Sequence, residues 1–232
     1  NWFDNMSKAR PPVLSSAEIF SGFIFSGNYK ESRTRMLSYI SSHWPGSQLV
    51  LFLREPSDFV TSVYLQYLNI GGTIEFENFL EEFQILEGVN YPELMGELNN
   101  MEWGNILYIL YEDFVDDPCS QISKIENYVG DRFSYCIEND RVNKSVENLA
   151  ARTLRLTNKF APYNGRHGSK TAIKILRNLG LMPRDLLQKN NLFSVLSRIG
   201  SPVVDVNVKE EIRVQFSGSW QETRELVKLQ KV

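Results

Sequence analysis

The pattern of apolar and polar positions divides the chain into two parts. Up to about residue 130, short apolar runs alternate with segments whose apolar residues recur at helical spacing, and from residue 145 onward the pattern is mainly helical. Alternation of this kind is typical of βαβ units, which build a parallel sheet. We therefore predict a single domain over residues 1–232, with an α/β core at 13–130 and a mainly helical region at 145–232.

Two unbroken apolar runs, residues 49–53 and 106–110, have the length of strands. Strands that are buried on both faces show such continuous runs rather than alternation. We expect these two segments to be central strands covered by helices on both faces. Residues 13–16 form a third, shorter candidate strand that is followed by a loop.

Helical spacing follows both predicted central strands. Behind the first, Phe59, Val63 and Tyr67 recur every fourth residue, and either Ser57 or Asp58 can cap the helix that they indicate. Behind the second, Asp117 and Pro118 resemble a helix start and Gly130 a helix end. Further helices are expected over residues 33–42, 76–83, 149–158, 170–179 and 208–229.

Composition narrows the class of protein. The 25 Lys and Arg against 28 Asp and Glu give a net charge of −3, so there is no global basic field to attract nucleic acid. Cys119 and Cys136 form neither a disulfide framework nor a zinc-site spacing. No apolar run approaches the roughly 18 residues of a membrane span, and the start lacks the features of a secretory signal. We expect a soluble, cytoplasmic protein whose oligomeric state the sequence does not indicate.

Ligands of open parallel sheets bind outside the carboxyl ends of the strands. Arg54, Tyr111 and the loop of residues 16–18 follow the predicted strands and therefore qualify. Arg54 offers a planar, charged fork suited to phosphate, beside a helix start whose free N–H groups also favour an anion. The hydroxyl of Ser62 can reach the same anion. The alternative is an arginine paired with a carboxylate and a serine that faces solvent.

The combination of these residues resembles the sulfotransferase family. Residues 54–64 fit the family pattern Arg-x-Pro-x-Asp-x-x-x-Ser-x-Tyr, and residues 110–114 with Asp117-Pro118 resemble its Tyr-Glu-Asp-Leu segment and downstream Asp-Pro. Residues 14–18 and 142–145 are similar to segments of bacterial members that act on carbohydrate. The resemblance covers roughly residues 13–160 and, more faintly, the final helix.

The resemblance implies an α/β fold, a three-layer parallel sheet with flanking helices similar to P-loop nucleotide kinases, followed by the helical C-terminal region. It also implies sulfuryl transfer from 3′-phosphoadenosine-5′-phosphosulfate (PAPS) to a hydroxyl of a glycan, glycolipid or other glycoconjugate. Arg54 and Ser62 would grip the 3′-phosphate and Tyr111 would border the adenine. A non-catalytic nucleotide-binding module and a nucleotide kinase-like enzyme are the alternatives.

One family feature is missing from the sequence. Sulfotransferases begin with a strand and a glycine-rich loop that carries lysine and Ser/Thr, and no such stretch occurs here. An N-terminal segment outside the sequence, a degenerate binding module and a rearranged fold each explain this. We favour the first, because Asn1 is not a natural start.

Glu18 is our candidate general base, since it follows a predicted strand and lies at the sheet edge where the acceptor hydroxyl would sit. Ser16, on the same loop, would orient Glu18 and contact the nucleotide. His167 is the alternative base. Its neighbours Arg166 and Lys170 belong to a basic, glycine-containing loop that can fold over a phosphate or remain solvated. We expect no metal, because a sulfuryl group carries less charge than a phosphoryl group. Glu112 and Asp113 instead face solvent or helix starts.

Overall fold

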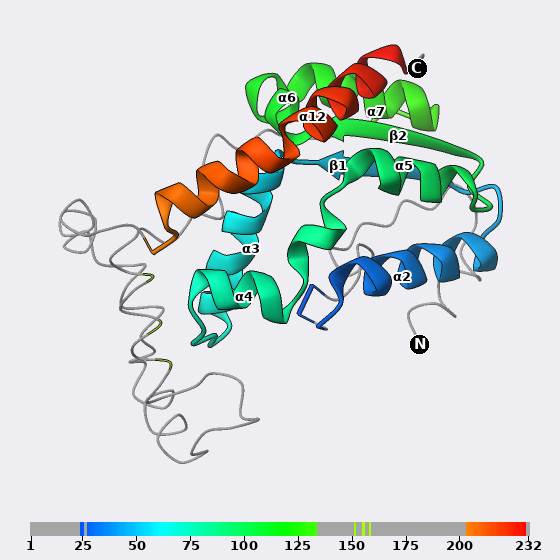
Figure 1. Cartoon of the computed structure of the whole chain (residues 1–232). Coiled ribbons are helices and arrows are strands. Elements are labelled where there is room, and N and C mark those ends of the chain that lie inside the picture. The colour runs from blue at the N-terminus through cyan, green and yellow to red at the C-terminus, as the bar shows by residue number, and fades with distance from the viewer. Residues whose placement is uncertain are drawn as a thin grey trace, which may run out of the picture.

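A computed structural model describes residues 24–25, 27–133, 151, 155, 158 and 203–230 (Figure 1). Strands β1 (Gln48–Leu53) and β2 (Asn105–Leu110) lie side by side and run parallel. Their register aligns Leu53 with Leu110, so both strands end at the same level. The predicted α/β class and the two predicted strands are confirmed, whereas the expected strand at 13–16 lies outside the described residues.

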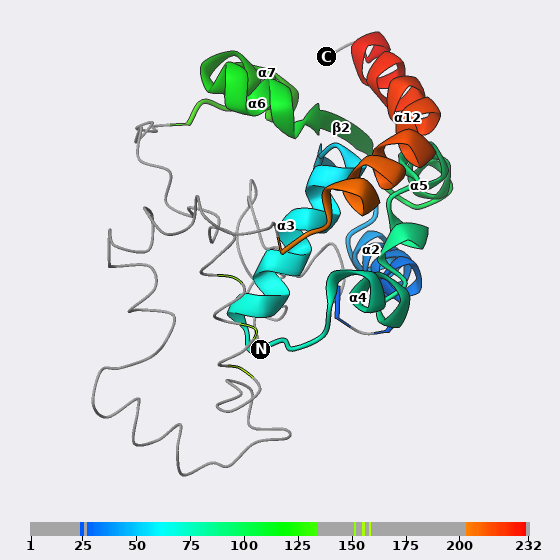
Figure 2. The ribbon, with the colours of Figure 1, turned by 60° about the vertical axis from the view of Figure 1, so that its left-hand side comes forward.

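Helices precede, connect and follow the two strands. The described helices are α2 (Tyr29–His43), α3 (Pro56–Asn69), α4 (Phe76–Glu82), the 3-10 turn η2 (Ile85–Gly88), α5 (Tyr91–Asn99), α6 (Tyr111–Asp116), α7 (Pro118–Val129) and α12 (Val206–Leu229). Figure 2 shows α6 and α7 on one side of the strand pair and α2 and α5 on the other. The long α12 packs against α3, α5 and β2.

The two faces of β1 differ in how well they are covered. Leu49, Leu51 and Leu53 face the cluster built by α2, α5 and α12, and Leu53 is fully buried. On the opposite face Phe52 is 44% exposed and packs edge-on against Phe114 of α6, with ring centroids 5.3 Å apart. The prediction that both faces of this strand are buried is therefore wrong at Phe52, where a single ring supplies the aromatic contact.

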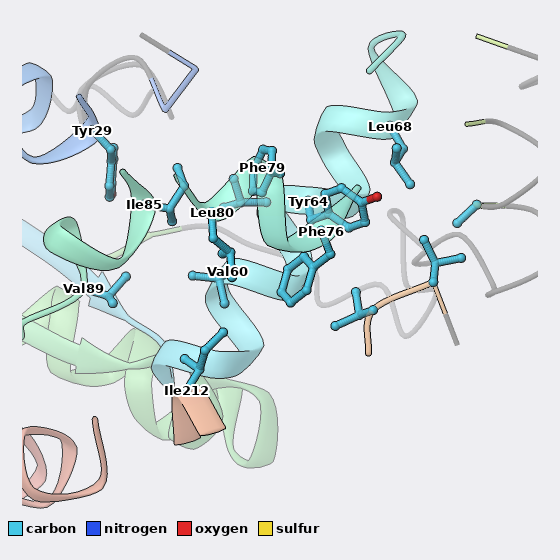
Figure 3. Close-up of a cluster of buried hydrophobic side chains, with 14 of the residues drawn as sticks. Tyr29, Val60, Tyr64, Leu68, Phe76, Phe79, Leu80, Ile85, Val89 and Ile212 are labelled. Atoms are coloured by element: carbon cyan, nitrogen blue, oxygen red, sulfur yellow. The ribbon is translucent and has the colours of Figure 1, made fainter. Parts of the chain in front are cut away.

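The main aromatic core lies where α3, α4 and η2 meet (Figure 3). Tyr64 and Phe79 are completely buried there, with ring centroids 5.2 Å apart, and the Tyr64 hydroxyl donates to the Ile74 carbonyl at 2.9 Å. Asn158, which is helical as predicted, donates to the carbonyls of Leu68 and Gly72 at the end of α3, both at 2.8 Å. The helix expected at 149–158 thus contributes to this core at its described positions.

The outer edge of β2 is closed by a side chain. The Gln230 amide accepts from the Tyr108 N–H at 3.0 Å and donates to the Ile106 carbonyl at 3.1 Å, as a neighbouring strand would. Unpaired strand edges invite association with other chains. The residue that follows α12 therefore satisfies backbone groups that the two-stranded pairing leaves open.

Candidate functional site

Arg54 and Tyr111 meet at the carboxyl ends of β1 and β2. Each directly follows its strand, and the aligned strand ends bring the two residues together. The Arg54 guanidinium carbon lies 4.8 Å from the centroid of the Tyr111 ring, and that ring is 40% exposed. A cation over an aromatic face is attracted by the ring quadrupole. The sequence-based expectation that these residues share one edge agrees with the structure.

The charge of Arg54 is not neutralised by any of the described residues. Its side chain is half-buried, and within the described ranges it makes no ion pair. The alternative interpretation, an arginine paired with a carboxylate, is therefore not what this part of the structure contains. A half-buried guanidinium held over an open ring is suited to receive an anion.

The start of α3 differs from the prediction. Its cap is Glu55 rather than Ser57 or Asp58: the Glu55 carboxylate accepts from the Asp58 N–H at 2.9 Å and from the Ser57 hydroxyl at 2.6 Å. Sequence preferences missed this because Glu is not among the favoured caps. The N–H of Glu55 is taken by the carboxylate of Glu112 at 3.0 Å. The N–H groups of Asp58 and Glu55 therefore serve the protein's own carboxylates and are not free for an anion, contrary to the expectation for this helix start.

Ser62 lies on α3, one turn beyond Asp58 on the same face of the helix, and is exposed. The Asp58 carboxylate contacts the Lys209 ammonium of α12 at 2.6 Å. This ion pair offsets the negative charge on the face that leads to Ser62. Sequence reasoning missed Lys209, because no local pattern connects residues 151 positions apart.

Two further side chains hold the backbone of this edge. The Tyr91 hydroxyl of α5 donates to the Arg54 carbonyl at 2.7 Å, and Glu112 of α6 binds the next N–H. Burial raises the pKa of Tyr91 far above its usual range, so its hydroxyl stays protonated. Glu112 therefore points toward a helix start, as one of the two predicted orientations has it, while Asp113 is exposed.

The other predicted site residues are not placed by this structure. Ser16, Glu18, Arg166, His167 and Lys170 lie outside the described residues. Within the described ranges, no three His, Cys, Asp or Glu side chains gather as a metal ion would require. No helix in the same ranges has both the length and the apolar character to cross a membrane.

Comparison with known proteins gives one match. The family model described as the sulfotransferase domain matches residues 36–164, more than half of the chain. This range contains both Arg54 and Tyr111. None of the curated proteins and none of the solved structures compared with the chain matches it.

Proposed function

Because this chain belongs to the sulfotransferase family, and sulfuryl transfer is the activity of that family, we propose that it takes the sulfuryl group from PAPS. We further propose that the acceptor is a hydroxyl of a carbohydrate or glycoconjugate. The similarity of residues 14–18 and 142–145 to segments of bacterial carbohydrate sulfotransferases supports that acceptor class.

The observation that carries the proposal is the arrangement of Arg54. Its guanidinium lies over the Tyr111 ring at 4.8 Å, at the carboxyl edge of two parallel strands, with no carboxylate partner in the described part of the chain. A structural arginine in a half-buried position is normally paired, because an unpaired charge there loses hydration without compensation. An anionic ligand would supply the missing partner.

The residues at this edge fit a nucleotide that carries a 3′-phosphate. Arg54 can make charge-assisted, bidentate hydrogen bonds to that phosphate, and the exposed hydroxyl of Ser62 can donate to it from α3. The open part of the Tyr111 ring offers an apolar surface to the adenine. The nucleotide supplies the sulfuryl group, which is joined to a 5′-phosphate leaving group. The three-layer arrangement similar to P-loop nucleotide kinases remains part of this proposal.

The proposed reaction is an in-line displacement. The oxygen of the acceptor hydroxyl forms a bond to sulfur, the bond between sulfur and the 5′-phosphate oxygen breaks, and the hydroxyl proton passes to a base. Glu18, oriented by Ser16, is the proposed base and His167 the alternative. Arg166 and Lys170 are proposed to contact the phosphates.

Thermal unfolding in the presence of different nucleotides tests the proposal. Adenosine-3′,5′-bisphosphate, adenosine-5′-phosphate and ATP are compared at equal concentration against the protein without ligand. A ligand at a hundredfold excess over its Kd stabilises the folded state by about 2.7 kcal/mol, so we expect the bisphosphate to raise Tm by several degrees and well above the other two.

Each other pattern of stabilisation has a distinct meaning. Stronger stabilisation by ATP than by the bisphosphate would favour a nucleotide kinase-like enzyme. Stabilisation by the bisphosphate without turnover of PAPS would favour a non-catalytic binding module. Equal stabilisation by the two adenosine phosphates would contradict the 3′-phosphate grip.

A further inference from the structure

One peptide group at the site is held at both ends by side chains from other elements. It joins Arg54 to Glu55, directly after β1. Its carbonyl accepts from the Tyr91 hydroxyl at 2.7 Å, and its N–H donates to the Glu112 carboxylate at 3.0 Å. Tyr91 begins α5 and Glu112 lies in α6, so two separate helices fix the same peptide plane. We name Tyr91 and Glu112 the 54–55 clamp.

The clamp fixes the backbone position from which the Arg54 side chain extends. A planar peptide has one orientation once both its carbonyl and its N–H are bound. The backbone of Arg54 is therefore fixed relative to α5 and α6. Glu112 directly follows Tyr111, whose ring lies under the Arg54 guanidinium at 4.8 Å. The hydrogen bond from the Glu55 N–H to Glu112 therefore fixes the guanidinium of Arg54 and the ring of Tyr111 relative to each other.

Burial makes both hydrogen bonds costly to lose. Tyr91 is 6% exposed and packs against Trp220 of α12, with ring centroids 5.8 Å apart. Glu112 is half-buried, and its second carboxylate oxygen is enclosed without a partner among the described residues. Hydrogen bonds in such surroundings are stronger than in water. The Glu112 carboxylate is partly enclosed although one backbone N–H is its described partner. This indicates that the hydrogen bond to the Glu55 N–H is important for the position of the peptide.

We propose that Tyr91 and Glu112 are positioning residues for the 3′-phosphate grip, acting through Arg54. This inference rests on the proposed function. A guanidinium whose backbone is fixed in advance loses less conformational freedom when it binds phosphate, so the clamp raises affinity for nucleotides that carry a 3′-phosphate and leaves others unaffected.

Tyrosine substitutions offer a matched pair for the first test. Tyr91→Phe removes the hydroxyl that binds the Arg54 carbonyl. Tyr128→Phe is the control. It removes a hydroxyl that donates to the carbonyl of Leu49, near the start of β1, at 3.3 Å. Calorimetric titration measures the Kd of each variant for adenosine-3′,5′-bisphosphate and adenosine-5′-phosphate. We expect Tyr91→Phe to bind the bisphosphate about 5- to 10-fold more weakly, with an unchanged Kd for the monophosphate. We expect Tyr128→Phe to bind both nucleotides with the Kd values of wild type.

Glu112 allows a second test at constant charge. Glu112→Gln and Glu112→Ala both remove the negative charge, but the glutamine oxygen can still accept from the Glu55 N–H. The preference for the bisphosphate is the Kd for adenosine-5′-phosphate divided by the Kd for adenosine-3′,5′-bisphosphate. We expect Glu112→Gln to keep this ratio within about twofold of wild type and Glu112→Ala to lower it by about fivefold. If Glu112 acts only through its charge, the two variants have the same ratio.

The outcomes separate the two proposals. A wild type that binds both nucleotides equally would overturn the 3′-phosphate assignment and the positioning role together. A wild type that prefers the bisphosphate, with Tyr91→Phe indistinguishable from Tyr128→Phe or Glu112→Ala indistinguishable from Glu112→Gln, would overturn the clamp alone. Amide hydrogen exchange at Glu55 should be faster in Glu112→Ala than in Glu112→Gln, because only the glutamine oxygen can still accept from this N–H.

Discussion

At the scale of single residues, the charge of the site depends on which groups its carboxylates bind. Glu55 caps its own helix, Glu112 binds the Glu55 N–H, and Asp58 pairs with Lys209. These three carboxylates are thus engaged with other groups than Arg54. Among the described residues, the Arg54 guanidinium contacts the Tyr111 ring, which attracts its charge without cancelling it. This division explains how a cation remains available in a chain of net charge −3.

Replacing Ser62 with alanine tests the second member of the grip. A neutral donor to a charged phosphate contributes about 1.5 to 3 kcal/mol when enclosed, and Ser62 is exposed, so we expect a loss near 1 kcal/mol. Titration with adenosine-3′,5′-bisphosphate should show roughly fivefold weaker binding. Thr61→Val is the control, because the Thr61 hydroxyl binds the Ser57 carbonyl inside α3 at 2.7 Å. Wild-type affinity in Ser62→Ala would exclude Ser62 from the site.

At the scale of elements, the local sequence patterns predict the strands, helices and helix ends that local interactions determine. The apolar runs of β1 and β2, the spacing in α3, and the Asp117 cap and Gly130 end of α7 all appear as expected. The sequence also carries a signal for α5, since Leu94, Met95 and Leu98 recur at helical spacing. We did not predict that helix.

Contacts between distant elements were beyond the reach of such patterns. Arg33 is 3% exposed, although arginine is rarely buried without a partner. It binds the Gly88 carbonyl of η2 and lies over the Tyr29 ring. A partner 55 positions away leaves no local trace in the sequence.

Gly88→Ala should disturb the contact between α2 and η2. A Cβ at Gly88 would overlap the ring of Tyr29, which is buried at 4% exposure. Overpacking of this kind costs about 1 to 3 kcal/mol. Urea denaturation measures the loss. In Gly96→Ala, the control in α5, a Cβ meets nothing within 4 Å, so stability should be unchanged or slightly raised. Equal stability of the two variants would contradict the packing described here.

Tyr108 makes stability sensitive to high pH. Burial raises the pKa of Tyr108 from 10.0 to about 12, and its hydroxyl has no partner among the described residues. The folded state therefore holds this proton longer than the unfolded state, and stability falls as pH rises from about 10 to about 12. We expect Tyr108→Phe to reduce this alkaline loss by roughly 2 to 3 kcal/mol. Parallel denaturation profiles of the two proteins would contradict the raised pKa.

At the scale of the whole molecule, α12 joins parts of the chain that lie far apart in sequence. Lys209 near its start reaches Asp58 of α3, Trp220 packs on Tyr91 of the clamp, and Gln230 just beyond its end closes the edge of β2. The sequence predicted this helix but not its neighbours, because amphipathic spacing gives no information on which surface a helix will cover. The C-terminal helix therefore supports the site as well as the sheet.

Glu18→Gln tests the proposed base. The substitution preserves shape and removes basicity, so turnover should fall by roughly 10²-fold or more while nucleotide affinity stays nearly unchanged. Transfer from PAPS to a carbohydrate acceptor is the measurement. Turnover within a few-fold of wild type in Glu18→Gln, together with an inactive His167→Ala, would assign the base to His167 instead.

Arg54→Ala provides the most direct test of the central claim, that the edge formed by β1 and β2 grips a 3′-phosphate. Calorimetric titration compares adenosine-3′,5′-bisphosphate with adenosine-5′-phosphate on wild type and variant. We predict that the variant binds the bisphosphate about 2 to 4 kcal/mol more weakly, because a charge-assisted contact is lost, and binds the monophosphate as wild type does. An equal loss of affinity for both nucleotides would show that Arg54 has a structural role and would contradict the claim.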